Sequence, residues 1–304
     1  MKLIRRIFDL LCKRGLPGVV EGVRRVIGVT GLHGMARWLR QPLERWFFAS
    51  PIHLPLKSKQ RIRIEESLRS CVVGKEPVSK TKKLFEFPTV EELLALWPLR
   101  TALVRALEPI NRGDTYFHEL GSQNRQRRLS KGLFDIWLSM NFPFGTVLEI
   151  GSRTGVSLIE KLIYHPSPDA VAVLSMDLYV ELGSPRIIKR NMRYLGIPIG
   201  NVHLLTGDSL SIFPKLMTEL PYASFDYALV DGSHIEADAY QDLCNVIPFI
   251  RSGGFLVFDD TGPDEYGNYQ LLETWERAMA SCKEDFTAKH YDEPYGFCVA
   301  QRLR

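Results

Sequence analysis

Aspartates follow two short apolar runs in the second half of the chain, at the points where those runs end. Asp231 follows the run 227–230, and Asp259 and Asp260 follow the run 255–258. If both runs are neighbouring strands, three carboxylates meet at one sheet edge and would repel strongly without a cation. Carboxylate oxygens suit Mg²⁺, with water and substrate oxygens completing an octahedron. The sequence therefore predicts a divalent metal site at these three aspartates, which would lower the pKa of a substrate hydroxyl. The alternative is that Asp231 contacts only a cofactor or substrate, while Asp259 or Asp260 caps a loop.

A histidine lies three residues after the first of these aspartates. The imidazole of His234 could take the proton of a hydroxyl group near neutral pH. His234 and Asp231 are therefore the predicted catalytic residues. The structural alternative is a histidine that caps the following helix or bonds Asp231.

A turn with two glycines follows the apolar run 146–150. Gly151 and Gly155 have the spacing G-x-x-x-G, and glycines at a strand-to-helix turn let a ligand approach the backbone closely. Arg153 stands where a dinucleotide fingerprint has its second glycine, and no Gly-Lys-Ser/Thr follows, so neither that fingerprint nor a P-loop is present. Glu149, before the turn, would repel a phosphate and suit a cationic ligand.

Two further acids follow the next two apolar runs. Asp177, near the end of 171–178, could accept both hydroxyls of a ribose. Asp208, after the run 202–206, is placed to accept from an exocyclic amine such as that of adenine. Each acid could instead be only a helix N-cap.

Apolar runs alternate with helical stretches after residue 146, which is typical of βαβ units and a parallel sheet buried on both faces. The runs are 146–150, 171–178, 202–206, 227–230 and 255–258. After a last helix near 269–282, two β-like segments at 286–291 and 296–301 predict a terminal hairpin. Earlier in the chain, 90–110 is expected to be a helix capped by Thr89.

In this order the motifs resemble class I S-adenosylmethionine-dependent methyltransferases. The phrase EIGSRTG is similar to their cofactor loop. FDYALVDGSHIEADAYQDL and IRSGGFLVFDDT are similar to the small-molecule family called methyltransferase domain 24, whose relatives include catechol-type and macrolide-sugar O-methyltransferases. The resemblance covers about residue 133 to the C-terminus. It implies an α/β, Rossmann-like, mostly parallel seven-stranded sheet with an antiparallel terminal hairpin.

The resemblance also implies roles for individual residues. S-adenosylmethionine would bind at Glu149, Gly151, Ser152, Gly155, Ser157, Asp177, Asp208 and Ser209. Asp231 matches the metal-binding acid of the metal-dependent O-methyltransferases, and Asp259 and Asp260 match the acid pair after the fifth strand. Asp260 departs from the catechol-type enzymes, which commonly have Asn there, and His234 stands where they have a catalytic Lys.

The two halves of the chain carry opposite charge. Residues 1–140 contain 26 Lys and Arg against 13 Asp and Glu, whereas residues 141–304 contain 13 against 22. We expect a basic, mainly helical N-terminal region over 1–115, with 50–90 as loop or linker, and a methyltransferase domain over 116–304. Basic amphipathic segments within 1–48 are expected to pack on the rest or to form a dimer face; the alternative is a helix on an anionic membrane surface.

Cysteine usage bears on the compartment. The five cysteines are scattered and include no CxxC pair, which fits a reducing cytoplasm. No apolar run approaches membrane-spanning length. We expect a cytoplasmic protein, with a peripheral position at the inner membrane surface as the alternative that residues 1–48 suggest. A homo-oligomer is left open.

The predicted function is S-adenosylmethionine-dependent O-methylation of a hydroxylated small molecule or sugar, assisted by Mg²⁺. One alternative is a nucleic-acid methyltransferase docked by the basic N-terminal region. Against it, the fourth run ends in DGSH, where enzymes that methylate amino groups of bases usually carry Asn/Asp-Pro-Pro-aromatic. The other alternative is a hydroxylase-like relative or a cofactor-binding scaffold, because a fold alone does not fix the reaction.

Overall fold

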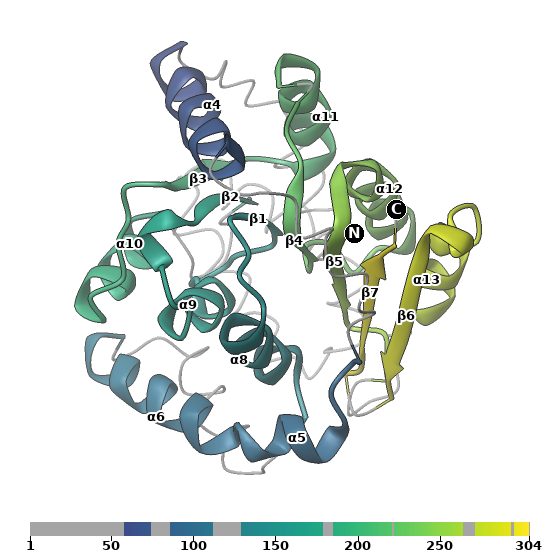
Figure 1. Cartoon of the computed structure of the whole chain (residues 1–304), viewed down its shortest axis with the longest axis horizontal. Coiled ribbons are helices and arrows are strands. Elements are labelled where there is room, and N and C mark those ends of the chain that lie inside the picture. Colours follow the sequence, from purple (N-terminus) through teal and green to yellow (C-terminus); the bar gives the residue numbers. More distant parts are fainter. Residues whose placement is uncertain are drawn as a thin grey trace, which may run out of the picture. The chain divides into compact units, whose positions relative to one another are not determined.

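The computed structural model describes residues 58–73, 86–111, 129–178, 185–220, 222–263, 271–292 and 295–303 (Figure 1). These residues lie within one compact unit of the chain, His53–Arg304. The basic segments predicted to be helical within residues 1–48 lie outside the described residues. None of the described helices is both long and apolar enough to span a membrane.

The described strands form one sheet in the order β3-β2-β1-β4-β5-β7-β6. They are β1 (Thr146–Ile150), β2 (Ala172–Asp177), β3 (Val202–Thr206), β4 (Phe225–Val230), β5 (Ile250–Asp259), β6 (Phe286–Tyr291) and β7 (Phe297–Arg302). The first five pair in parallel, and β7 runs antiparallel to both β5 and β6. The predicted seven-stranded, mostly parallel sheet with a terminal hairpin is confirmed. Chain order reverses between β1 and β4, and ligands of open α/β sheets bind at the carboxyl ends of such strands.

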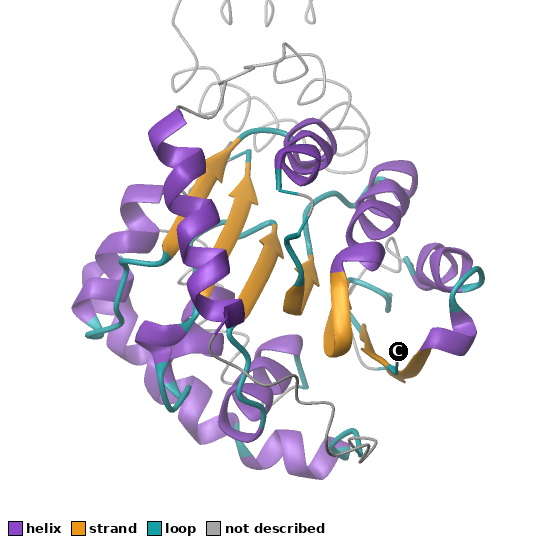
Figure 2. Ribbon diagram, turned by 45° about the horizontal axis from the view of Figure 1, so that its top comes forward, coloured by secondary structure: helices purple, strands orange, loops and turns teal. Residues whose placement is uncertain are grey.

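Helices cover both faces of the sheet (Figure 2). The helices on one face are α8 (Lys131–Asn141), α9 (Val156–Ile163) and α10 (Pro185–Tyr194), with α5 (Val90–Ala95) and α6 (Trp97–Leu107) packed against α8. Those on the other face are α4 (Ser58–Val73), α11 (Ser209–Glu219), α12 (Glu236–Val246) and α13 (Leu272–Met279). Short 3₁₀ helices lie at Glu108–Ile110, Pro168–Ala170, Ile247–Phe249 and Lys283–Asp285.

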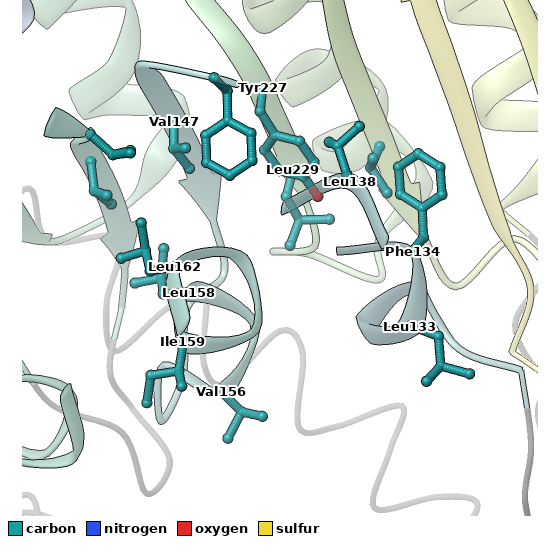
Figure 3. Packing of buried hydrophobic residues seen from close by; sticks show 14 of the residues in the cluster. Leu133, Phe134, Leu138, Val147, Val156, Leu158, Ile159, Leu162, Tyr227 and Leu229 are labelled. Carbon is teal, nitrogen blue, oxygen red and sulfur yellow. The ribbon is translucent and has the colours of Figure 1, made fainter. Parts of the chain in front are cut away.

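The two faces of the sheet carry separate hydrophobic cores. Val147 and Leu148 are successive residues of β1, and they contribute to different cores because strand side chains alternate. Figure 3 shows part of the first core, to which α8 contributes Phe134 and Leu138, β4 contributes Tyr227, and α9 contributes further apolar side chains. Each buried side chain of this size contributes about 1.5–3 kcal/mol relative to exposure. Burial on both faces explains why the sequences of the strands are near-continuous apolar runs.

The helix expected over 90–110 is two helices. The Thr89 side chain accepts from the Glu92 amide and the Glu92 side chain accepts from the Thr89 amide, which forms a capping box at the start of α5. The break falls at Leu96, and Pro98 occupies the first turn of α6. A proline there has no amide to donate to the carbonyl four residues earlier, and its ring would clash with that carbonyl, so one continuous helix is excluded.

The expectation of a loop or linker over 50–90 is wrong for residues 58–73, which form α4. Ile64 and Leu68 lie one turn apart and are buried against the second core, beside residues of β1 and β2. Charged neighbours such as Arg63 and Arg69 are exposed. They make the segment polar in composition, so the apolar pair does not stand out in the sequence. α5 and α6 also precede the boundary expected near residue 115, yet Leu93 and Leu103 belong to the first core.

Candidate active site

Lys131 lies between two of the three aspartates that end the fourth and fifth strands. It is the first residue of α8, and its ammonium forms ion pairs with Asp231 and, at 2.6 Å, with Oδ2 of Asp259. The side chains are 15% exposed for Lys131 and 19% for each aspartate, so water screens the charges only partly. The predicted charge repulsion at this edge is therefore relieved, at two of the three carboxylates, by a cation of the chain itself.

The third aspartate has a different partner. Asp260 follows β5 with a positive φ of 58°, and its Oδ2 lies 2.9 Å from Nε2 of His234. A positive φ in a residue other than glycine is uncommon, and here it directs Asp260 away from the strand and toward the turn after β4. One ligand atom from each of Asp231, His234 and Asp260 lies within 4.8 Å of the others.

The cluster therefore differs in one member from the predicted metal ligands. Asp231 and Asp260 come together as expected, while Asp259 pairs with Lys131 and His234 joins the group. The oxygens of Asp231 and Asp260 form a donor pair of the kind Mg²⁺ uses, because this ion often takes one or two carboxylates and completes its shell with water and substrate. The residues present fit a divalent cation at Asp231 and Asp260.

The close packing of charges changes the pKa of each group. Burial raises the pKa of Asp231 to about 7, against the opposing effect of Lys131, and burial likewise raises the pKa of Asp259. Burial alone would lower the pKa of Lys131, but Asp231 and Asp259 raise it well above its usual value. Burial alone would also lower the pKa of His234, but the hydrogen bond and the charge of Asp260 raise it. Several strongly shifted groups at one sheet edge are typical of functional sites.

The glycine turn lies directly beside this cluster. Gly151 has a φ of 91°, and a Cβ on it would come within 1.9 Å of the main-chain oxygen of Asp231. The Asp231 amide also donates to the carbonyl of Ile150. At the other end of the turn, Gly155 has a φ of 81° and begins α9, and a Cβ there would come within 2.8 Å of Ile188. Neither position tolerates a side chain without movement.

The structure places the other predicted cofactor residues along the same edge. The Arg153 amide donates to Oδ2 of Asp177 at 2.6 Å, which joins the turn to the end of β2. Ser152 is buried within the turn, and its carbonyl accepts from the Gly155 amide. Asp177 itself is half-buried at the end of β2.

Asp208 and Ser209, after β3, have partners within the chain. Asp208 is the N-cap of α11 and accepts from the Leu210 amide and from the Ser211 hydroxyl. Ser209 donates to Oδ2 of Asp242, a buried residue of α12. The N-cap alternative raised from the sequence is therefore realised for Asp208.

Glu149 is held in a buried network and does not present its charge to the turn. Lys161 donates to Oε2 of Glu149 at 2.8 Å and to Asp135 at 3.0 Å, and Ser157 donates to Oε1 of Glu149 at 2.8 Å. The Tyr227 hydroxyl donates to the second oxygen of Asp135 at 2.5 Å. The cation that the sequence suggested for Glu149 is thus Lys161, on α9.

Two lysines in these contacts were not among the predicted residues. Lys131 follows a run of arginines that resembles a solvated face, but it also occupies the first position of a helix, where the dipole disfavours a cation. That conflict is the local signal by which it could have been found. Lys161 gives no such signal, because it occupies an ordinary helical position and its acidic partners are on α8 and β1.

The sheet order, the glycine turn after β1 and the acids at the strand ends define the class I S-adenosylmethionine-dependent methyltransferase fold. Residues 148–261 match the model of a family described as "Methyltransferase domain". This part of the chain is therefore similar to a methyltransferase domain.

Solved structures of similar fold include two O-methyltransferases. TomG from Streptomyces achromogenes, involved in tomaymycin synthesis and solved with SAM, is 16% identical, with 75% of this chain and 95% of that chain covered and a TM-score of 0.48. The enzyme from Bacillus cereus, solved with SAH, is 17% identical, with 68% and 99% covered and a TM-score of 0.45. No curated protein matches the sequence.

Proposed function

We propose that the chain transfers the methyl group of S-adenosylmethionine to a hydroxyl oxygen of a small molecule or sugar, assisted by a divalent cation at Asp231 and Asp260. The observation that carries the proposal is the contact between Gly151 and the main chain of Asp231. It supports a donor and an acceptor site side by side, because the turn that receives the cofactor adjoins the carboxylates that would face the acceptor.

The cofactor end of the site rests on the turn and on Asp177. The absence of side chains at Gly151 and Gly155 leaves the backbone accessible to a ligand. Asp177 accepts the Arg153 amide, which fixes the carboxylate where it can accept the ribose hydroxyls. Asp208 supports the turn after β3 as an N-cap, and we assign it and Ser209 a positioning role beside the adenine.

The acceptor end rests on His234 and the aspartates. With the proton of Nε2 shared with Asp260, the imidazole can take the acceptor proton on Nδ1. The acceptor oxygen forms a bond to the methyl carbon as the carbon–sulfur bond breaks, which leaves S-adenosylhomocysteine and a protonated His234. A divalent cation, when bound, would lower the pKa of the acceptor hydroxyl. Catalysis then consists mainly of orientation and charge stabilisation.

The first test is calorimetric titration of the full chain with S-adenosylmethionine, followed by methyl transfer from labelled cofactor to a panel of hydroxylated small molecules. We expect binding with a stoichiometry of one, and a product heavier by one methyl group. Absence of cofactor binding would overturn the proposal. Full activity in the presence of EDTA would show that the reaction needs no divalent cation, while the proposed methyl transfer would still hold.

A further inference from the structure

The ammonium of Lys131 contacts the same carboxylate that the proposed cation would use. Its ion pairs with Asp231 and Asp259 place one positive charge between two of the three acids at this edge, and so compensate one of their two negative charges. Asp231 is also a member of the cluster with Asp260. A divalent cation that binds Asp231 must therefore approach a carboxylate that already has an ammonium as its partner.

The position of Lys131 is fixed by the packing of its helix. The next residue, Gly132, has so little space that a Cβ would come within 2.4 Å of Glu160 and 2.7 Å of Arg100. Those two side chains form an ion pair at 2.7 Å, of which Glu160 is 2% and Arg100 11% exposed. Leu133 and Phe134, which follow, are fully buried. The first turn of α8 is thus held against α6 and α9, and Lys131 cannot leave the aspartates by a shift of its backbone without breaking that packing.

Nothing in the helix itself favours a cation at this position. Lys131 lies at the helix N-terminus, where the dipole opposes a positive charge, and Ser130 forms no side-chain cap. The two carboxylates compensate for this, and their partial burial strengthens the attraction. Lys131 is therefore held at the acidic edge by the groups for which a divalent cation would compete.

We propose that Lys131 is a built-in competitor of the divalent cation, which lowers the affinity of the site for metal by occupying Asp231 and Asp259. This inference rests on the proposed cation site and adds its regulation: metal binds at Asp231 only when the Lys131 ammonium gives up that contact. A lysine that merely anchors α8 would leave the metal affinity unchanged when its charge is removed.

The test is a Mn²⁺ titration of the full chain, with free Mn²⁺ measured by electron paramagnetic resonance. Lys131→Met, which removes the charge and keeps an apolar stem, is expected to bind Mn²⁺ at least tenfold more tightly than the wild type. Lys131→Arg, which keeps the charge, should stay close to the wild type. Lys215→Met, at an exposed position of α11, is the matched control and should not change the affinity.

A further substitution shows where the ion binds. Adding Asp231→Asn to Lys131→Met should abolish the gain in Mn²⁺ affinity. If Lys131→Met does not fold, as judged by far-UV circular dichroism, Lys131→Met/Asp259→Asn serves in its place. It removes the ammonium together with one of its two carboxylate partners, and we expect it to bind Mn²⁺ about tenfold more tightly than Asp259→Asn alone. Equal or weaker Mn²⁺ binding in the folded variant, or no binding in any variant, would overturn the role of Lys131. The proposed function is tested separately, by cofactor binding and methyl transfer of the wild type, so its failure can be distinguished from failure of the proposal for Lys131.

Discussion

The main-chain carbonyl of Asp231 occupies the space that a side chain at Gly151 would need. A Cβ at Gly151 would lie 1.9 Å from that oxygen, and the backbone there has a φ of 91°. The turn after β1 and the end of β4 therefore fit together only because this residue is glycine. One small residue thus joins the predicted donor site to the predicted acceptor site.

Gly151→Ala is accordingly expected to abolish cofactor binding and to destabilise the fold. The strained backbone alone costs about 1–3 kcal/mol, and the clash adds to it. Gly196→Ala is the matched control, because Gly196 also has a positive φ, of 72°, but has nothing within 4 Å of its Cβ position. Calorimetry and urea unfolding measure both effects. If Gly151→Ala bound the cofactor as tightly as Gly196→Ala, the close contact between Gly151 and Asp231 would have no role in cofactor binding.

Asp177→Asn should weaken the binding of S-adenosylmethionine while the fold is kept. The amide retains an oxygen that can accept from the Arg153 amide, but it loses the charge that strengthens hydrogen bonds from the ribose hydroxyls. We expect a loss of about 10- to 100-fold, which corresponds to about 1.4–2.8 kcal/mol. Asp169→Asn, at an exposed position, is the control. An unchanged dissociation constant in Asp177→Asn would exclude Asp177 as the ribose partner.

The sheet and its glycine turn were predictable because their signals are local. The strand β1 spans the expected 146–150, and β3 spans the expected 202–206, since each is a mostly apolar run that ends at a polar or glycine-bearing turn. Thr89 was expected to cap its helix and does so. Each of these features is set by residues within a few positions of one another.

The ion pairs of the site were not predictable because their partners are distant in the sequence. Lys131 and Asp231 are 100 residues apart, and only the packing of α8 on the sheet brings them together. The sequence predicts that Glu149 suits a cationic ligand, yet Lys161 of the following helix pairs with it. Sequence patterns show where carboxylates gather, but they do not show which of them the chain neutralises itself.

His234→Gln is expected to lower the rate of methyl transfer with little change in cofactor affinity. The amide cannot take the acceptor proton, and general-base catalysis contributes about 10²–10⁴-fold in rate. The glutamine can still donate to Asp260, which His234 contacts at 2.9 Å, so the local fold should persist. Steady-state kinetics with labelled cofactor, together with calorimetry, separate the two quantities. A wild-type rate of methyl transfer in this variant would show that His234 is not the general base.

The buried Asp242 should make the protein less stable as the pH rises. Burial raises its pKa to about 7 in the folded state, whereas the unfolded chain has the ordinary value of 3.8. Between these values the unfolded chain binds fewer protons, so the free energy of unfolding falls as the pH increases. Asp242→Asn removes this effect and keeps an oxygen for the Ser209 hydroxyl. At pH 8 we expect it to exceed the wild type in stability by on the order of 1–3 kcal/mol, and at pH 4 to show no such gain. Urea unfolding at the two pH values measures this, and an identical difference at both would refute it.

Removing the buried Lys161 should destabilise the fold strongly. Its side chain is 1% exposed, and its ammonium pairs with Asp135 and Glu149, whose side chains are both fully buried. Lys161→Met leaves two carboxylates without their cation, and breaking a buried pair in this way costs about 3–5 kcal/mol. Adding Glu149→Gln to Lys161→Met should restore part of that loss, because it removes one of the uncompensated charges while Asp135 keeps the Tyr227 hydroxyl. Urea unfolding of the single and double variants gives the comparison. A double variant less stable than Lys161→Met would mean that Glu149 is stabilised by something other than the charge of Lys161.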